Sequence, residues 1–395
     1  LEALAARNRS TDDLVCFAGA GAYDHYVPAV LLPLAGRSEF YTSYTPYQPE
    51  LSQGVLQVLF GCQSLICELT GVEVSNASRY DGATALAEAV NLARSTPSRG
   101  RVLVSAAVDP RYVETLRTYG RGAGYEPELF DVVEGRGGSP VVGDDVACVV
   151  VQHPNAYGLL EPARELFGVA HAGGARAIQV FDPLSLGVLA PPGDLRADVA
   201  VGEGQVLGNH LHHGGPYLGL IATRLDDVRR LPGRIVGETL DVDGRTGYVL
   251  TLQAREQHIR REKATSNICT NQTLMAIAAT VYLGWLGPQG LEELGRQCAS
   301  KAAYAAQRLT EVPGVEPLFG DAPFFKEFPV RLPRPAAEVR DAMLERGYLA
   351  GVPLPDADGH ALLIAVTERR TREQIDGLAM AWNPWADKLY FVMHG

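Results

Sequence analysis

Residues 146–152 read VACVVVQ, an apolar run without the polar–apolar alternation of a strand that faces water on one side. Runs of the same kind stand on both sides of it, and segments with helical spacing separate several of them. The further predicted strands are 101–105, 177–181, 197–201 and 218–222, and the predicted helices are 112–119 and 164–172. Apolar strands separated by helices predict an α/β fold with a mostly parallel sheet that is covered on both faces.

Other helical patterns precede this sheet region. Residues 53–70 place apolar side chains at helical spacing and end before Gly71, a residue type that commonly ends helices. Asp81 and Gly82 are typical of a helix start, and this second helix is expected to run to about Arg94. Strand, helix and strand patterns then follow within 311–329 and 337–366. We predict three parts: an N-terminal arm with helices that contribute to an interface (1–70), a large domain (71–283) and a smaller α+β domain (284–395).

The composition is that of a chain with a packed interior, because 46% of the 395 residues are hydrophobic and 21% are charged. A net charge of −11 argues against nucleic acid as a partner, and no run of about 18 apolar residues predicts a membrane span. The six cysteines lack the CxxC spacing of metal sites, so we expect reduced thiols in a cytoplasmic protein. Leu1 follows no initiator methionine, so we expect that an N-terminal segment precedes it in the natural protein.

The segment 255–271, REQHIRREKATSNICTN, concentrates basic and small polar side chains over a few expected helical turns and a loop. Its basic or titratable residues are Arg255, His258, Arg260, Arg261 and Lys263, and its small polar residues are Thr265, Ser266 and Asn267. Cations followed by hydroxyls and an amide, close to a helix start, are suited to binding an anion. The alternative interpretation is a solvated basic helix face followed by a polar cap.

Five segments together resemble the glycine decarboxylase P-protein family of the glycine cleavage system. They are 19–25 (GAGAYDH), 41–54 (YTSYTPYQPELSQG), 80–89 (YDGATALAEA), 232–238 (PGRIVGE) and 255–271. They recur in the family's order, and the resemblance extends from about residue 10 to about residue 380. It is greatest to the separate first (alpha) subunit of the two-subunit form, whereas residues 382–395 depart from the family ending. The resemblance implies an aspartate-aminotransferase-like fold, the type I fold of enzymes that use pyridoxal phosphate (PLP).

Enzymes of that fold bind PLP through a lysine, a carboxylate that pairs with the pyridine nitrogen, and a helix N-terminus that receives the phosphate. The lysines of this chain are Lys263, Lys301, Lys326 and Lys388, and none lies in the expected interval 202–215. Asp182 stands where the pairing carboxylate is expected, although it could equally be a turn residue before Pro183. Asp81 is expected to cap a helix, since a carboxylate beside a phosphate is repulsive. Asp109 stands where enzymes of this fold often have a histidine that stacks on the cofactor ring, and a carboxylate cannot stack in this way. We therefore predict that this chain has no cofactor site of its own.

The same interval contains His210, His212 and His213. Histidines at positions i and i+2 of a strand share one face and could bind a metal ion. No carboxylate or cysteine lies beside them at ligand spacing, so we predict no metal site and leave the role of these histidines open.

The resemblance also implies partners and site residues. PLP would be held covalently by the second (beta) subunit, and a loop of this chain would complete the pocket, in an α2β2 assembly that also binds the lipoylated H-protein. Thr265, Ser266 and Asn267 would contact the phosphate of that PLP, and the basic residues of 255–271 would contact anions or the H-protein. Tyr44, Tyr47, Gln48 and Glu50 would line the substrate side. The reaction implied is decarboxylation of glycine, with transfer of the aminomethyl group to the lipoyl disulfide.

Two alternatives remain open at this point. The chain could be an alpha-type subunit of a specialised pathway whose PLP enzyme acts on another amino acid, as the altered 209–213 segment and the unusual C-terminus allow. It could also be a structural or regulatory subunit that contributes no residue to an active site. Substrate, stoichiometry and the contact of each residue in 255–271 are not decided by the sequence.

Overall fold

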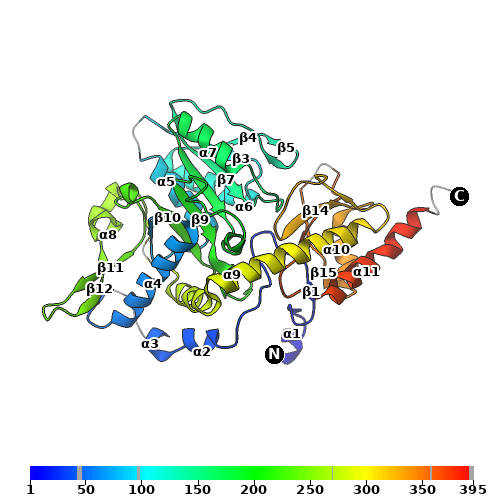
Figure 1. Cartoon of the computed structure of the whole chain (residues 1–395), viewed down its shortest axis with the longest axis horizontal. Coiled ribbons are helices and arrows are strands. Elements are labelled where there is room, and N and C mark those ends of the chain that lie inside the picture. Colours follow the sequence, from blue (N-terminus) through cyan, green and yellow to red (C-terminus); the bar gives the residue numbers. More distant parts are fainter. Residues whose placement is uncertain (42–46, 96–97, 269, 356–357, 391–395) are drawn as a thin grey trace. The chain divides into compact units, whose positions relative to one another are not determined.

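The computed structural model of this chain describes residues 1–41, 47–95, 98–268, 270–355 and 358–390 (Figure 1). The chain forms two compact units. The larger unit consists of Val27–Asn155 and Glu161–Glu293, and the smaller unit consists of Leu1–Tyr26, Ala156–Leu160 and Leu294–Gly395.

A seven-stranded sheet forms the centre of the larger unit. Its strands, in spatial order, are β2 (Val74–Ser75), β10 (Gly219–Thr223), β9 (Val199–Glu203), β8 (Arg176–Phe181), β7 (Val146–His153), β3 (Arg101–Ser105) and β4 (Pro127–Phe130). The strands from β9 to β4 are parallel to their neighbours, whereas β10 is antiparallel to both β9 and β2. The prediction of a mostly parallel sheet is confirmed.

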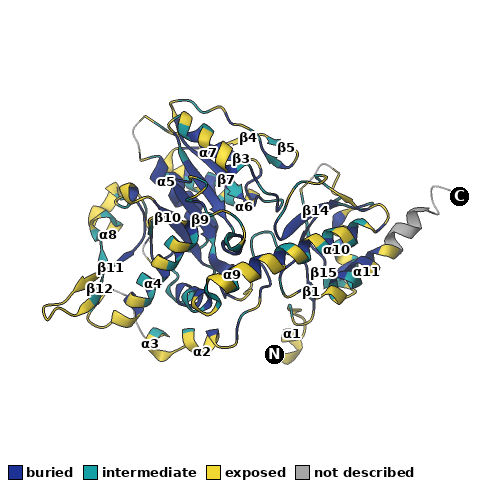
Figure 2. Ribbon diagram, viewed as in Figure 1, coloured by how far each residue is buried: buried dark blue, intermediate teal, exposed yellow. Residues whose placement is uncertain are grey.

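Helices cover both faces of this sheet because alternate side chains of each strand point to opposite sides. Val102 and Val104 pack in one core with α5 (Gly82–Ala93) and α6 (Pro110–Ala123). Leu103 lies on the other face, in the core that includes α7 (Ala163–Ala172). Figure 2 shows the strands of the sheet as buried and the outer faces of the helices as exposed.

The helix predicted at 53–70 is confirmed as α4 (Gln53–Thr70), and it ends at Gly71 in the left-handed conformation (φ 65°). Residues of α4 contact an antiparallel hairpin, β11 (Ile235–Leu240) and β12 (Thr246–Thr251), which the sequence analysis missed. The Oδ1 atom of Asp241 accepts from the backbone of residues 243 and 245 at 2.8 Å, which closes the turn. An Asp-Gly pair between alternating segments is a hairpin signal that could have been used.

The smaller unit contains a four-stranded antiparallel sheet and a two-stranded parallel one. The first consists of β13 (Glu316–Pro317), β14 (Glu327–Arg331), β17 (Ala361–Ala365) and β16 (Val352–Pro353), and the second of β1 (Val15–Cys16) and β15 (Tyr348–Leu349). Side chains of β14 and β17 pack with α10 (Ala336–Leu344) and α11 (Arg372–Tyr390) in one apolar core. Strand, helix and strand units were predicted here and are found.

The two compact units do not coincide with the three predicted ranges. Residues 1–26 belong to the smaller unit, because β1 pairs with β15 and the Ala365 N–H donates to the Phe17 carbonyl at 2.8 Å. Residues 27–70 belong to the larger unit. The division near the C-terminal side falls between residues 293 and 294 rather than at 283, within the long helix α9 (Thr273–Thr310).

Helix α9 is, among the described residues, the one helix whose length and composition would allow it to cross a membrane. Its backbone is interrupted at Gly287 (φ 60°, ψ 179°), which precedes Pro288. The 273–286 part before this break is shorter than the ~20 residues that a bilayer requires. The absence of a membrane partner therefore stays a prediction.

The remaining elements are short. They are α1 (Glu2–Ala5), α2 (Leu31–Ala35), α3 (Ser38–Tyr41), β5 (Val132–Val133), β6 (Arg136–Gly137), α8 (Gln257–Arg260) and the 3-10 turns η1 (Pro183–Gly187), η2 (Gly204–Val206), η3 (Leu225–Asp227), η4 (Gln253–Arg255) and η5 (Arg261–Lys263).

Candidate functional site

Helix α5 begins in the larger unit at a capping box. The Asp81 carboxylate accepts the Thr84 backbone N–H at 2.8 Å, and the Thr84 hydroxyl oxygen accepts the Asp81 N–H at 3.2 Å. The predicted role of Asp81 as a helix cap is confirmed. The capping box does not include the N–H of Gly82, the first residue of the helix, so that N–H needs another acceptor.

That acceptor is the Glu203 carboxylate at the end of β9. One oxygen accepts the Gly82 N–H at 2.9 Å, and the other accepts the N–H groups of Gln205 at 2.9 Å and Leu218 at 3.0 Å. Three backbone N–H groups from separate parts of the chain therefore converge on one carboxylate. We call this group the amide nest: the N–H groups of Gly82, Gln205 and Leu218.

Close packing around the amide nest requires a glycine at its centre. A Cβ atom on Gly82 would lie 2.1 Å from the Tyr112 hydroxyl and 3.1 Å from the Cβ of Glu203. Burial raises the pKa of Glu203 to about 7, although its N–H donors oppose this increase. Burial also raises the pKa of Tyr112 well above its ordinary value, with a further contribution from the Glu203 charge.

A pH effect on stability follows from this raised pKa. Between pH 4.5 and 7 folded Glu203 keeps a proton that the unfolded chain has lost, so its contribution to stability is full below pH 4.5 and decreases as the pH rises through 7. We expect the unfolding free energy of the wild type to decrease by about 1 kcal/mol per pH unit over this window relative to Glu203→Gln. Urea denaturation of both proteins from pH 5 to pH 8 measures this, and parallel curves would contradict it.

Two carboxylates at positions where the sequence analysis considered groups of a PLP site, Asp182 and Asp109, are bonded within the chain. Asp182 caps η1 by accepting the Leu184 N–H at 3.0 Å, as expected of a turn residue. Asp109 caps α6 and pairs with the Arg111 guanidinium, whose Nε lies 2.9 Å from its carboxylate. Lys263 lies in η5, and no lysine occurs between β9 and β10. These residues do not form a site that could bind PLP covalently.

The basic part of segment 255–271 is less helical than expected. In its described part, the segment forms one α-helical turn, α8, between the 3-10 turns η4 and η5. Arg255 points inward and donates to the carbonyls of Leu252 at 3.0 Å, Gly233 at 2.7 Å and Leu231. The predicted role of Arg255 in binding an external anion is therefore replaced by a structural one. The other basic residues, His258, Arg260, Arg261 and Lys263, are exposed.

The three small polar residues of the segment separate into two kinds. The Ser266 hydroxyl donates to a carboxylate oxygen of Glu88 at 2.6 Å, and its oxygen accepts the Ile268 N–H at 3.1 Å. Thr265 and Asn267 are exposed, and their side chains form no hydrogen bond within the described part of the chain. Ser266 anchors the segment internally, while Thr265 and Asn267 are available to a partner.

The anchor of Ser266 is a buried ion pair that sequence analysis did not identify. An Nη2 atom of Arg79 lies 2.6 Å from Glu88, and both side chains are at most 2% exposed. The Nε and Nη1 atoms of Arg79 have no hydrogen-bond partner among the described residues. The two residues are nine positions apart, on a loop and on α5, so no helical spacing signals the pair.

Three of the segments that resemble the P-protein family meet in the larger unit. The Arg234 guanidinium lies 4.1 Å from the centre of the Tyr47 ring, and its Nη1 atom lies 3.4 Å from Oδ1 of Asn271. The Asn271 side chain in turn donates to the Ser78 hydroxyl at 3.0 Å. Tyr47 is 43% exposed, so part of its ring faces solvent. Gln48 and Glu50 are exposed beside it, and Tyr44 lies outside the described residues.

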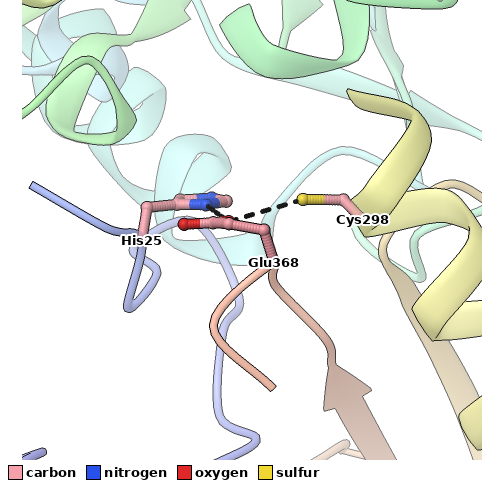
Figure 3. A group of neighbouring side chains, drawn as sticks. All are labelled: His25, Cys298 and Glu368. Carbon is pink, nitrogen blue, oxygen red and sulfur yellow. Dashed lines mark hydrogen bonds and ion pairs between the residues drawn. The ribbon is translucent and has the colours of Figure 1, made fainter. Parts of the chain in front are cut away.

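One cluster in the smaller unit has the residue types of a metal site. His25, Cys298 and Glu368 are the one such group among the described residues (Figure 3). His25 Nδ1 lies 2.7 Å from Glu368, and its Nε2 lies 3.1 Å from the buried Lys326 amino group. A neutral imidazole that donates to Glu368 and accepts from Lys326 satisfies all three groups, whereas a metal on Nδ1 would turn an N–H toward Lys326. We interpret the cluster as a hydrogen-bond relay.

The histidines at 210, 212 and 213 lie in an exposed loop rather than on a strand. The rings of His210 and His212 are 6.0 Å apart between centres, in an edge-to-face arrangement. They do not form a metal-binding group with a third ligand in the described residues.

Comparisons with known proteins agree with this description. The glycine cleavage system P-protein family matches residues 1–382. A probable glycine dehydrogenase (decarboxylating) subunit 1 of Moorella thermoacetica is 54% identical over 389 residues, which cover 96% of this chain and 86% of that protein.

Solved structures give the same result. A crystal structure of glycine decarboxylase (P-protein) of the glycine cleavage system, in inhibitor-bound form, matches with a TM-score of 0.94 at 48% identity and covers 97% of this chain and 87% of that one. An aspartate aminotransferase of Thermus thermophilus matches with a TM-score of 0.65 at 19% identity, over 94% of this chain and 99% of that one. The aspartate-aminotransferase-like fold predicted from the sequence is confirmed.

Proposed function

Because this chain belongs to the glycine cleavage system P-protein family, we propose that it is the first subunit of a two-subunit glycine decarboxylase, whose PLP is held covalently by the second subunit. The observation that supports this division most is the amide nest. Glu203 occupies the N-terminus of α5, where a phosphate could otherwise be received, and no lysine follows β9. PLP supplies the electron acceptor for decarboxylation when it is bound in the assembled enzyme.

Residues of this chain would complete the partner's site. Thr265 and Asn267 are exposed donors that can hydrogen-bond the phosphate of the partner's PLP, and Ser266 fixes their position through Glu88. Tyr47, Gln48 and Glu50 would face the substrate side of the same pocket, with Tyr47 held by Arg234.

The exposed basic residues of segment 255–271 suggest where the H-protein binds. His258, Arg260, Arg261 and Lys263 lie together on α8 and η5, where they would attract an acidic protein surface. We assign this surface to the lipoylated H-protein. The assembly would be an α2β2 heterotetramer in the cytoplasm.

Activity should require both subunits. We expect exchange of glycine carboxyl carbon with labelled bicarbonate, in the presence of lipoylated H-protein, only after this chain and its second subunit are combined. Measuring each chain alone and then together tests this. Full exchange activity of the second subunit alone would contradict the proposal and would favour a purely structural role for this chain.

The alternative of a specialised enzyme for another amino acid has no observation in its favour. Replacing glycine with alanine or serine in the same exchange assay separates the two, because only the alternative predicts faster exchange with the larger amino acid.

A further inference from the structure

The amide nest is more than a local helix cap. A cap for η2 needs only the contact between Glu203 and the Gln205 N–H, two residues along the chain. The same carboxylate also reaches Gly82, at the start of α5, and Leu218, just before β10. These two contacts join segments that are 121 and 15 residues from Glu203 in sequence, so the carboxylate binds at a meeting point of three segments.

Three converging backbone N–H groups are the kind of donor set that binds an oxyanion. Backbone N–H groups that converge from a helix start and adjoining loops bind phosphate, sulfate or carboxylate, and the helix dipole favours the negative charge. Here the group that accepts these N–H groups belongs to the chain itself, since it is the Glu203 side chain. Gly82 makes the approach possible, since a side chain there would collide with Tyr112.

The site lies among buried residues. Glu203 is of intermediate exposure, whereas Gly82, Gln205 and Leu218, which contribute the N–H groups, are buried. Removing the side chain beyond Cβ would free three N–H donors. The Asp81 carboxylate is a negative charge close enough to contribute to the raised pKa of Glu203, so it would also disfavour an anion bound there.

We propose that Glu203 is the residue that excludes phosphate from this subunit, and that the amide nest binds a tetrahedral oxyanion once that carboxylate is removed. This inference rests on the proposed function, in that it explains why one subunit of the pair carries no PLP. In the wild type, the Glu203 side chain occupies the site and its two oxygens accept the three N–H groups, so a phosphate group finds neither space nor free donors. Glu203 is thus a specificity-determining residue for cofactor placement.

The test uses the full chain and inorganic phosphate, measured by isothermal titration calorimetry at constant ionic strength. We expect no saturable binding by the wild type, and binding by Glu203→Ala with a dissociation constant of about 1 mM or lower. Glu203→Ser is measured in parallel, because a serine hydroxyl still caps η2 and protects the fold if the alanine variant is unstable.

Two further variants make the result specific. Glu161→Ala removes another buried carboxylate of the larger unit, which accepts the Gly137 N–H at 2.8 Å, and it should not bind phosphate. Adding Asp81→Asn to Glu203→Ser removes the opposing charge but keeps a helix cap, and it should tighten binding several-fold.

The inference is overturned if folded Glu203→Ser binds no phosphate, if the wild type binds as tightly as the variants, or if Glu161→Ala binds equally well. These measurements involve neither the second subunit nor catalysis. A failure here is therefore distinguishable from a failure of the proposed function, which the exchange assay reports.

Discussion

The Glu88→Ala variant is expected to lose about 3–5 kcal/mol of unfolding free energy, because it leaves the Arg79 guanidinium buried without its carboxylate. The same substitution would remove the acceptor of the Ser266 hydroxyl. Thr265 and Asn267 would then no longer be held in the position that the proposed function requires. Burial already lowers the pKa of Arg79, and the Glu88 charge is the main effect that opposes this. Urea denaturation of the variant and the wild type measures the difference.

A matched double variant distinguishes a broken ion pair from a simple cavity. Replacing Arg79 and Glu88 together with methionine removes both charges, so it should destabilise the chain much less than Glu88→Ala. A double variant that is as unstable as the single one would show that the ion pair is not the source of the effect. A loss below about 1 kcal/mol for Glu88→Ala would contradict the buried pair itself.

The second large effect is expected in the assembled enzyme. Replacing both Thr265 and Asn267 with alanine should weaken PLP retention, since each lost hydrogen bond to a phosphate is worth roughly 1.5–3 kcal/mol. Absorbance of bound PLP after gel filtration, as a function of added PLP, measures this change. Tyr47→Phe should instead keep PLP binding and lower turnover, because the proposed function places Tyr47 on the substrate side of the pocket.

Two controls accompany this prediction. Thr246→Ala removes an exposed threonine hydroxyl on the β11–β12 hairpin and should leave PLP retention unchanged. Ser266→Ala removes the internal anchor, so it should alter stability together with retention. If the Thr265 and Asn267 double variant retains PLP as tightly as the parent, the segment has only a structural role.

Much of the fold was predictable because it depends on local patterns. The strand at 101–105 and the helix at 53–70 were found with the bounds predicted, since apolar runs and helical spacing are contained in those residues themselves. The absence of a lysine after β9 was also predictable, because it requires only that the predicted strands be counted in the order that the fold implies.

The contacts of the candidate site were not predictable in the same way. Ser266 and Glu88 are 178 residues apart, and Glu203 and Gly82 are 121 residues apart, so their pairing depends on how the sheet brings distant segments together. Arg255 illustrates the converse error. Its charge suggested an external anion, but three backbone carbonyls lie within its reach once the chain has folded.

The division of labour between the two subunits has one direct test. The two chains are co-expressed, the complex is reduced with borohydride so that PLP is fixed to its lysine, and each chain is digested and analysed by mass spectrometry. The account predicts one phosphopyridoxyl-lysine on the second subunit and none on this chain, whose interval between β9 and β10 contains no lysine. A stoichiometric label on Lys263, Lys301, Lys326 or Lys388 of this chain would contradict it.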